Sequence, residues 1–125
     1  MQNLFKSCSL IIIAVGMILS SASCQIAPLT GAPVDPQGLK NGVYEGEYRK
    51  GFNKVVVKVT IAEGRITDVA LVKHTASWIG RKTDKIIPQR ILAQQSTKVD
   101  AISGATNSSR VIMNAVQKAI EKAYQ

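Results

Sequence analysis

A threonine hydroxyl lies where a run of predicted strands gives way to a predicted helix. Residues 100–106 read Asp-Ala-Ile-Ser-Gly-Ala-Thr, and Thr106 is placed at or just before the first residue of the helix. The unpaired N–H groups of a helix N-terminus, with about half a positive charge from the macrodipole, favour a phosphate or another anion. Gly104 can adopt a positive φ and leaves room for a ligand to approach the backbone. The same residue types also form an ordinary turn and helix cap, so the motif alone does not establish a ligand.

The helix after Thr106 is predicted from the spacing of its apolar residues. They recur with a period near 3.6 along one face: Val111, Ile112, Ala115, Val116, Ala119, Ile120 and Ala123. Ahead of this apolar face, the side-chain oxygens of Thr106, Asn107, Ser108 and Ser109 can each accept a hydrogen bond from a free N–H of the first turn. The pattern therefore predicts an amphipathic helix whose N-terminus holds the hydroxyl of Thr106.

Three predicted strands precede this helix. Residues 42–48 alternate in polarity at their start, residues 54–61 place four aliphatic side chains on one face, and residues 66–73 return after a tight turn. A shorter helix is expected over residues 88–95, beginning at Pro88, because proline is best tolerated in the first turn. The expected fold is a small α+β domain with an antiparallel meander and two helices.

The seven residues 100–106 resemble the flavinylation motif of the FMN-binding domain family. That motif has an aspartate, two variable positions, a small hydroxyl residue and then Gly-Ala-Thr, which correspond here to Asp100, Ser103, Gly104, Ala105 and Thr106. The resemblance implies that FMN is joined to Thr106 through a phosphodiester bond. It also implies that the other four residues belong to the flavin site and that residues 41–125 form the FMN-binding domain.

Two further fragments match the same family in the same order. Gly42, Tyr44 and Gly46 resemble its opening strand, and Gly64, Ile66 and Val69 resemble its returning strand. One departure follows the threonine, where family members commonly continue with a variable residue and then Thr-Ser, whereas this chain has Asn107-Ser108-Ser109. Attachment is expected to survive this change, with Thr106 favoured over Ser103, Ser108 or Ser109 as the acceptor.

The single histidine and the single tryptophan are the other candidates for a role beside a flavin. His74 ends the third strand, where it could act as a proton donor near the ring or simply close the strand, and the family resemblance places it among the cofactor-binding residues. Trp78 could stack on a flavin ring, but a lone tryptophan in a small domain is more often packed in the core. Core packing is therefore the expectation for Trp78.

The family resemblance also implies how the cofactor arrives and what it does. A magnesium-dependent flavin transferase would take FAD as donor and leave FMN on the threonine, because the motif contains no dedicated base for self-modification. The expected function is an extracytoplasmic electron carrier that serves a membrane redox partner of the quinone reductase or ferredoxin oxidoreductase type. No catalytic residue is assigned, since about 85 residues leave little room for a second substrate pocket.

Other classes of function remain open at this point. A domain of the same fold could bind flavin non-covalently, or could dock a partner as an envelope lipoprotein without a redox role. A structural lipoprotein with a basic surface is a third alternative. These alternatives differ in whether flavin is absent, is released on denaturation or remains attached to the chain.

The N-terminal residues carry a secretory pattern. Residues 1–23 have a positive start at Lys6, an apolar run over residues 9–19 and small residues thereafter, which predicts an export signal. Cys24 follows Ser20-Ser21-Ala22-Ser23 and resembles the lipidated cysteine of a bacterial lipoprotein, although an aliphatic residue is more usual where Ser21 stands. A membrane-anchored lipoprotein facing the extracytoplasmic side is expected, with simple signal cleavage as the alternative. Residues 24–40 are rich in proline and glycine and are expected to form a flexible tether.

The charge and the cysteine content exclude some classes of function. The formal net charge is +8, but the basic residues are dispersed and only 5% of residues are aromatic, which argues against a nucleic-acid interface. Cys8 lies within the predicted signal, so the exported chain would retain only Cys24. No disulfide and no cysteine metal site are therefore expected.

Overall fold

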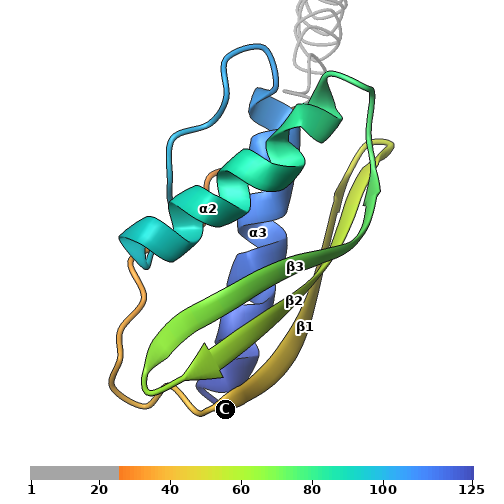
Figure 1. The fold of residues 1–125 in the computed structure, drawn as a ribbon. Coiled ribbons are helices and arrows are strands. Elements are labelled where there is room, and N and C mark those ends of the chain that lie inside the picture. The colour runs from red at the N-terminus through yellow and green to blue at the C-terminus, as the bar shows by residue number, and fades with distance from the viewer. Residues whose placement is uncertain (1–25) are drawn as a thin grey trace, which may run out of the picture.

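The structure is a computed structural model, and it describes residues 26–125. Within these residues six elements follow one another: β1 (Gly42–Lys50), β2 (Asn53–Ala62), β3 (Arg65–Thr75), the 3₁₀ turn η2 (Gly80–Lys82), α2 (Thr83–Gln94) and α3 (Thr106–Ala123). The three strands form one sheet in the order β1-β2-β3, and both strand pairs are antiparallel. The predicted meander is therefore confirmed, as is the α+β class (Figure 1).

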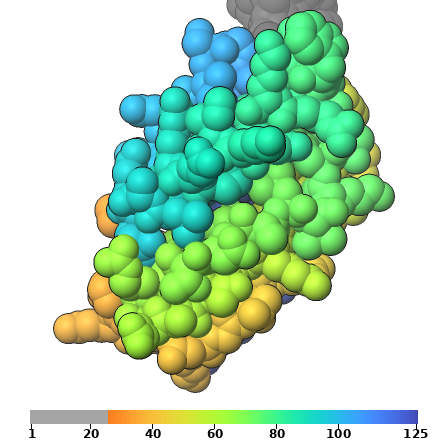
Figure 2. Space-filling model, in the orientation of Figure 1, coloured from red at the N-terminus to blue at the C-terminus, as the bar shows by residue number. Residues whose placement is uncertain are grey.

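Both helices cover the same face of the sheet. In β2 the side chains of Val55, Val57, Val59 and Ile61 are buried, whereas Lys58, which points to the other face, is exposed. The long helix α3 contacts β1 and β2, while α2 contacts β3 and α3. The space between the ribbons of α2 and β3 in Figure 1 is filled by side chains, as Figure 2 shows. The domain thus has two layers with one core between them.

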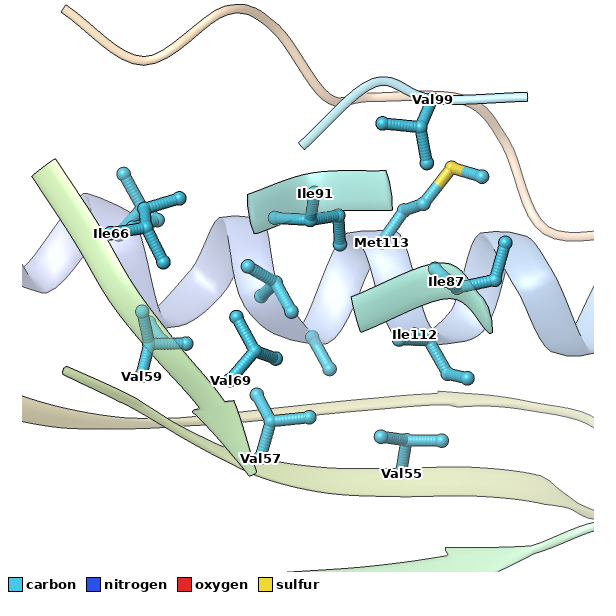
Figure 3. Packing of buried hydrophobic residues seen from close by; sticks show 14 of the residues in the cluster. Val55, Val57, Val59, Ile66, Val69, Ile87, Ile91, Val99, Ile112 and Met113 are labelled. Atoms are coloured by element: carbon cyan, nitrogen blue, oxygen red, sulfur yellow. The ribbon is translucent and has the colours of Figure 1, made fainter. Parts of the chain in front are cut away.

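The core joins all of these elements in one cluster. Figure 3 shows Val55, Val57 and Val59 of β2 facing aliphatic side chains of α2 and α3. Ile87 and Ile91 of α2 are fully buried. Burial of each such side chain stabilises the fold by about 1.5–3 kcal/mol, so the packing fixes how α3 is placed on the sheet.

A glycine allows α3 to approach the sheet closely. A Cβ atom on Gly46 of β1 would lie 2.0 Å from the carbonyl oxygen of Ala115 and 2.7 Å from the backbone nitrogen of Ala119. Any side chain at this position would therefore force the helix away from the strand. Gly46 of β1 is therefore needed for α3 to pack closely against the sheet.

Two irregularities shift the pairing of β3. The register changes between Thr60 and Ile61 and between Val56 and Val57 of β2. Val72 is passed over at the second irregularity, and its side chain is 55% exposed. A β-bulge leaves one extra residue of the strand unpaired and bends the strand, so the side chain of that residue need not point into the core.

The helix predicted to begin at Pro88 begins earlier. α2 starts at Thr83, and Pro88 lies buried in its interior. The missing proline N–H removes one helical hydrogen bond, but Ile87 and Ile91 on either side bury completely in the core. Packing therefore outweighs the local cost, and the expectation that proline marks the first turn was wrong. The helix ends before Gln95, which adopts the left-handed conformation with a φ of 49°.

The flexible tether predicted for residues 24–40 is wrong for residues 26–40, which lie along the domain. Pro33 forms a β-bridge with Ser96, and the N–H of Val34 donates to the carbonyl of Gln95 at 2.9 Å. Asn114 of α3 donates from Nδ2 to the carbonyl of Pro28 at 2.9 Å. Side chains far along the chain therefore satisfy backbone groups of this segment, which its composition does not reveal.

The predicted signal over residues 1–23 and the lipidation site at Cys24 lie outside the residues that the structure describes. Within residues 26–125, no helix has the length and apolar character that a membrane crossing requires. The same residues contain no cluster of three or more metal-ligating His, Cys, Asp or Glu side chains.

Candidate functional site

A pocket of about 260 Å³ lies at the N-terminus of α3. Its lining comes from three places in the chain, which are the turn between β1 and β2, the segment leading into η2 and the start of α3. The lining residues are Phe52, Asn53, Ser77, Ile79, Gly80, Gly104, Ala105, Thr106, Asn107 and Ser108. The meander and α3 thus bring the motif of residues 100–106 against the end of the sheet.

A tight turn delivers Thr106 to this pocket. The N–H of Ala105 donates to the carbonyl of Ile102 at 2.9 Å, and Gly104 within the turn has a φ of 81°. A positive φ at the third position is the requirement of a type II turn, which explains the glycine. A Cβ at Gly104 would meet no atom within 4 Å, so this position is open to a ligand.

Ser109 braces the turn from within α3. Its hydroxyl donates to the carbonyl of Ala105 at 2.8 Å and accepts from the N–H of Ile102 at 3.0 Å. Ser109 is fully buried and Ser108 is 5% exposed. Both serines were expected as helix caps or alternative acceptors, but the hydroxyl of Ser109 is bonded to the loop and that of Ser108 accepts a hydrogen bond from Nδ2 of Asn53.

No side chain caps the N-terminus of α3. Ala105 is the N-cap residue, and the first turn contains no acidic residue. The capping role expected for the polar residues 106–109 is therefore wrong. Among the described residues, the first-turn N–H groups are left available to an anion in the pocket, where the helix dipole adds about half a positive charge.

Asn53 forms the buried wall of the pocket and was missed in the sequence. Its side chain donates from Nδ2 to the Oγ of Ser108 at 2.6 Å, and its Oδ1 lies 3.1 Å from Nε2 of His74. Nδ1 of His74 in turn contacts Oδ1 of Asp84 on α2. The sequence did contain a sign of this role. Asn53 is two residues before Val55 in the same strand, so its polar side chain points to the same, buried face of the sheet.

The sequence-predicted site residues divide into two groups. Gly104, Ala105 and Thr106 line the pocket, and Thr106 is half-buried. Ser103 and Asp100 are exposed and do not line it; the carbonyl of Asp100 accepts from Nη1 of Arg90 at 2.7 Å.

His74 lies at the end of β3, where the sequence placed it, but outside the pocket, and Trp78 lies outside the core. The His74 side chain is 2% exposed and reaches the pocket only through Asn53, so it lies behind the pocket wall. Trp78 is 72% exposed, so the expected core packing is wrong. Its ring instead lies under the ammonium group of Lys82, which is 4.9 Å from the ring centroid.

The residues present suit the phosphate end of a nucleotide. The open helix N-terminus, the bare Gly104 and the hydroxyl of Thr106 lie together in one pocket. The pocket volume is below the roughly 300–1,000 Å³ of sites that enclose a small molecule. A flavin mononucleotide held here would therefore leave part of its ring outside, beside the exposed Phe52 and Ile79.

Comparison with known proteins finds relatives that share part of this chain. An uncharacterized protein of Treponema pallidum (strain Nichols) is 36% identical over 92 residues, which are 70% of this chain and 24% of that protein. The NADH:acrylate oxidoreductase of Vibrio harveyi is 34% identical over 90 residues, which are 70% of this chain and 9% of that protein. The NADH:fumarate oxidoreductase of Klebsiella pneumoniae (strain 342) is 32% identical over 84 residues, which are 66% of this chain and 9% of that protein.

The chain thus spans a quarter or less of the length of each of these relatives. A family model gives the broader assignment. The model of the FMN-binding domain matches residues 51–121, which is more than half of the chain and includes β2, β3, α2 and almost all of α3. The matched region contains every residue that lines the pocket. The protein therefore belongs to the FMN-binding domain family.

Proposed function

We propose that the chain is an electron-transfer flavoprotein that carries FMN covalently, through a phosphodiester bond to Oγ1 of Thr106. The observation that carries this proposal is the position of Thr106, which is the first residue of α3 and lines the pocket. A phosphate on this oxygen stands directly at an uncapped helix N-terminus. When bound, FMN supplies reversible transfer of one or two electrons.

The residues of the pocket have distinct roles in holding the group. The first-turn N–H groups of α3 stabilise the negative charge of the phosphodiester. Gly104 leaves the approach to Thr106 uncrowded, since nothing lies within 4 Å of a Cβ at that position. Phe52 and Ile79, which are 68% and 42% exposed, offer apolar surface to the ring. Asn53 closes the far wall.

Attachment requires a second protein. The described residues that line the pocket include no carboxylate and no imidazole that could remove the proton from Thr106. A magnesium-dependent flavin transferase therefore supplies the base. Oγ1 of Thr106 forms a bond to the FMN phosphorus of FAD, the pyrophosphate bond breaks, AMP leaves and the threonine proton is released. The products balance as one flavinylated chain and one AMP.

The setting of the carrier is part of the proposal. Two of the relatives are named as oxidoreductases that use NADH, which supports a redox role for the segment they share with this chain. The predicted signal and Cys24 suit an exported protein anchored to the membrane by a lipid and facing the extracytoplasmic side. Its redox partner is then a membrane complex of the quinone reductase or ferredoxin oxidoreductase type.

Intact mass after denaturation tests the proposal. The full chain is co-expressed with a flavin transferase, denatured and weighed, and the modified peptide is sequenced by mass spectrometry. A gain of one FMN less one water, located on Thr106, is expected. Thr106→Val, which keeps the shape of the side chain, should abolish the gain. Ser103→Ala is the matched control, because Ser103 is an exposed hydroxyl outside the pocket, and it should leave the gain unchanged.

Two results would overturn the covalent assignment. Modification of Ser103 in place of Thr106 would remove the role given to the helix N-terminus. A native protein that is yellow but loses all its colour on denaturation would establish non-covalent binding in the same pocket.

A further inference from the structure

The pocket end of the domain exposes large apolar side chains together with basic ones. Trp78 and Phe52 are 72% and 68% exposed, and Ile26 and Ile79 are 43% and 42% exposed. The apical surface is defined here by these four residues and the exposed Arg81 and Lys82 of η2. Figure 1 shows the β1–β2 turn, η2 and the start of α3 at one end of the molecule, opposite the C-terminus.

The pocket lies within the apical surface. Phe52 and Ile79 line it, and Trp78 lies between Ser77 and Ile79, which both do so. Ile26 lies near the pocket because the N–H of the next residue, Ala27, donates to Oδ1 of the lining residue Asn107 at 2.9 Å. Whatever covers this surface therefore also faces the pocket.

The composition of the apical surface matches the interfacial region of a lipid bilayer. Tryptophan and other aromatic side chains favour the headgroup level of a membrane, where an apolar ring and a polar edge are both satisfied. Arg81 and Lys82 add attraction to anionic headgroups, and the ammonium group of Lys82 already lies over the Trp78 ring. Other exposed aliphatic residues are placed on other elements or on the N-terminal segment: Leu29, Val43, Val72 and Ile86.

The N-terminal segment is fixed beside this surface. Arg110 of α3 donates from Nη1 to the carbonyl of Ala27 at 3.2 Å, so both backbone groups of Ala27 are bound to the first turns of the helix. Ala27 is the third residue after Cys24, and a chain of that length spans at most roughly 10 Å. A lipid anchor at Cys24 would therefore hold the end of the domain that carries the apical surface close to the membrane.

We propose that the apical surface rests on the headgroup region of an anionic phospholipid bilayer and holds the pocket towards the membrane. The meaning of this contact for electron transfer rests on the function proposed above, because it places a flavin on Thr106 where a membrane redox partner can reach it. The contact itself needs no flavin. The partner of the apical surface is the lipid bilayer, and the attachment of Ala27 to α3 sets the orientation of the domain on it.

Trp78 provides the test, since it is the single tryptophan of the chain. The full chain is expressed without a transferase, purified from the cell membrane and reconstituted into vesicles of phosphatidylcholine and phosphatidylglycerol. A blue shift of the Trp78 emission, quenching by brominated lipids and protection from aqueous iodide are expected. Red-shifted emission that iodide quenches equally with and without vesicles, and that brominated lipid leaves unchanged, would overturn the proposal.

Matched variants separate the apical surface from the rest of the domain. In Trp78→Phe/Phe52→Trp the new tryptophan stays on the apical surface and should again be quenched by brominated lipid. In Trp78→Phe/Tyr124→Trp it moves to the C-terminal end, where position 124 is 40% exposed, and should be quenched by iodide alone. Equal lipid quenching of both variants would exclude a fixed orientation and overturn the proposal.

A charge variant tests the headgroup contribution. Arg81→Gln/Lys82→Gln should lose much of its quenching by brominated phosphatidylglycerol, and salt should have the same effect on the unsubstituted protein. Retained quenching in both cases would overturn the role given to the anionic headgroups. Because all these measurements use protein without flavin, a failure of flavin attachment is detected separately, by the mass of the chain.

Discussion

Nδ2 of Asn53 lies 2.6 Å from Oγ of Ser108, and this bond joins the first residue of β2 to the first turn of α3. Oδ1 of Asn53 is 3.1 Å from Nε2 of His74, whose other ring nitrogen contacts Asp84. A strand end, a neighbouring strand and both helices are thus connected through one amide group. The wall of the pocket is therefore fixed by polar contacts, while the core below it is fixed by apolar packing.

The first prediction concerns this amide. Asn53→Ala removes partners from two buried groups, Ser108 Oγ and His74 Nε2, and should lower the free energy of unfolding by roughly 2–4 kcal/mol. Asn41→Ala is the control, since exposed Asn41 accepts one bond from the N–H of Glu63 and should cost less than about 1 kcal/mol. Urea denaturation of both variants measures the difference. Equal losses would mean that the bonds of Asn53 contribute nothing beyond those of a surface asparagine.

The second prediction distinguishes the effect of backbone strain on stability from an effect on flavin transfer at the pocket. Gly104 and Gly51 both have a positive φ, of 81° and 63°, and at both positions a Cβ atom would extend into open space. Alanine at either position should cost about 1–2 kcal/mol of stability, because an L-residue is strained in this conformation. Only Gly104→Ala should also slow flavin transfer to Thr106, measured as the rate of mass gain with purified transferase and FAD. An equal slowing in Gly51→Ala would trace the effect to stability alone.

The third prediction concerns the approach of α3 to the sheet. A Cβ on Gly46 would lie 2.0 Å from the carbonyl oxygen of Ala115, and this backbone atom cannot move without shifting the helix. Gly46→Ala should therefore lower the free energy of unfolding by more than roughly 2 kcal/mol. Thermal unfolding monitored by circular dichroism checks this value, with Gly51→Ala as the unhindered comparison. A smaller loss for Gly46→Ala than for Gly51→Ala would contradict the close contact.

Periodicity predicted the elements whose side chains repeat regularly. The valines of β2 and the apolar face of α3 are buried as their spacing requires, and α3 begins at Thr106. Gly104 also adopts the positive φ expected of it. These features depend on local chemistry and on one-dimensional pattern, so a single sequence is sufficient to predict them.

Features that depend on contacts distant in sequence were missed. Asn53 and Ser108 are 55 residues apart, and neither forms a recognisable motif with the other. Pro88 was expected to begin the helix because proline lacks the N–H for a helical hydrogen bond, but the residues around it are buried in the core and α2 continues through it. Trp78 was assigned to the core from its type, whereas the structure places it at the rim of the pocket end. In each case tertiary packing decided against the local preference.

The N-terminal segment gives the last prediction. Ala27 is fully buried, and its N–H donates to Oδ1 of Asn107, a residue that lines the pocket. Asn107→Ala removes this acceptor, so exchange of the Ala27 amide hydrogen should accelerate by roughly tenfold, corresponding to the loss of about one hydrogen bond. Hydrogen exchange measured by NMR spectroscopy on the flavin-free chain provides the rate.

Thr30→Val is the matched control for this measurement. It removes the 2.8 Å bond from Thr30 Oγ1 to Oδ1 of Asn114 but leaves both bonds of Ala27 in place, so the Ala27 amide should exchange as before. Equal acceleration in the two variants would mean that the segment opens as a whole and that Asn107 is not its specific attachment point. A selective effect of Asn107→Ala would instead establish that the residue after Thr106 holds the N-terminal segment. The N-terminal segment, which we propose lies towards the membrane, and Thr106, which we propose carries the flavin, would then be linked through adjacent residues.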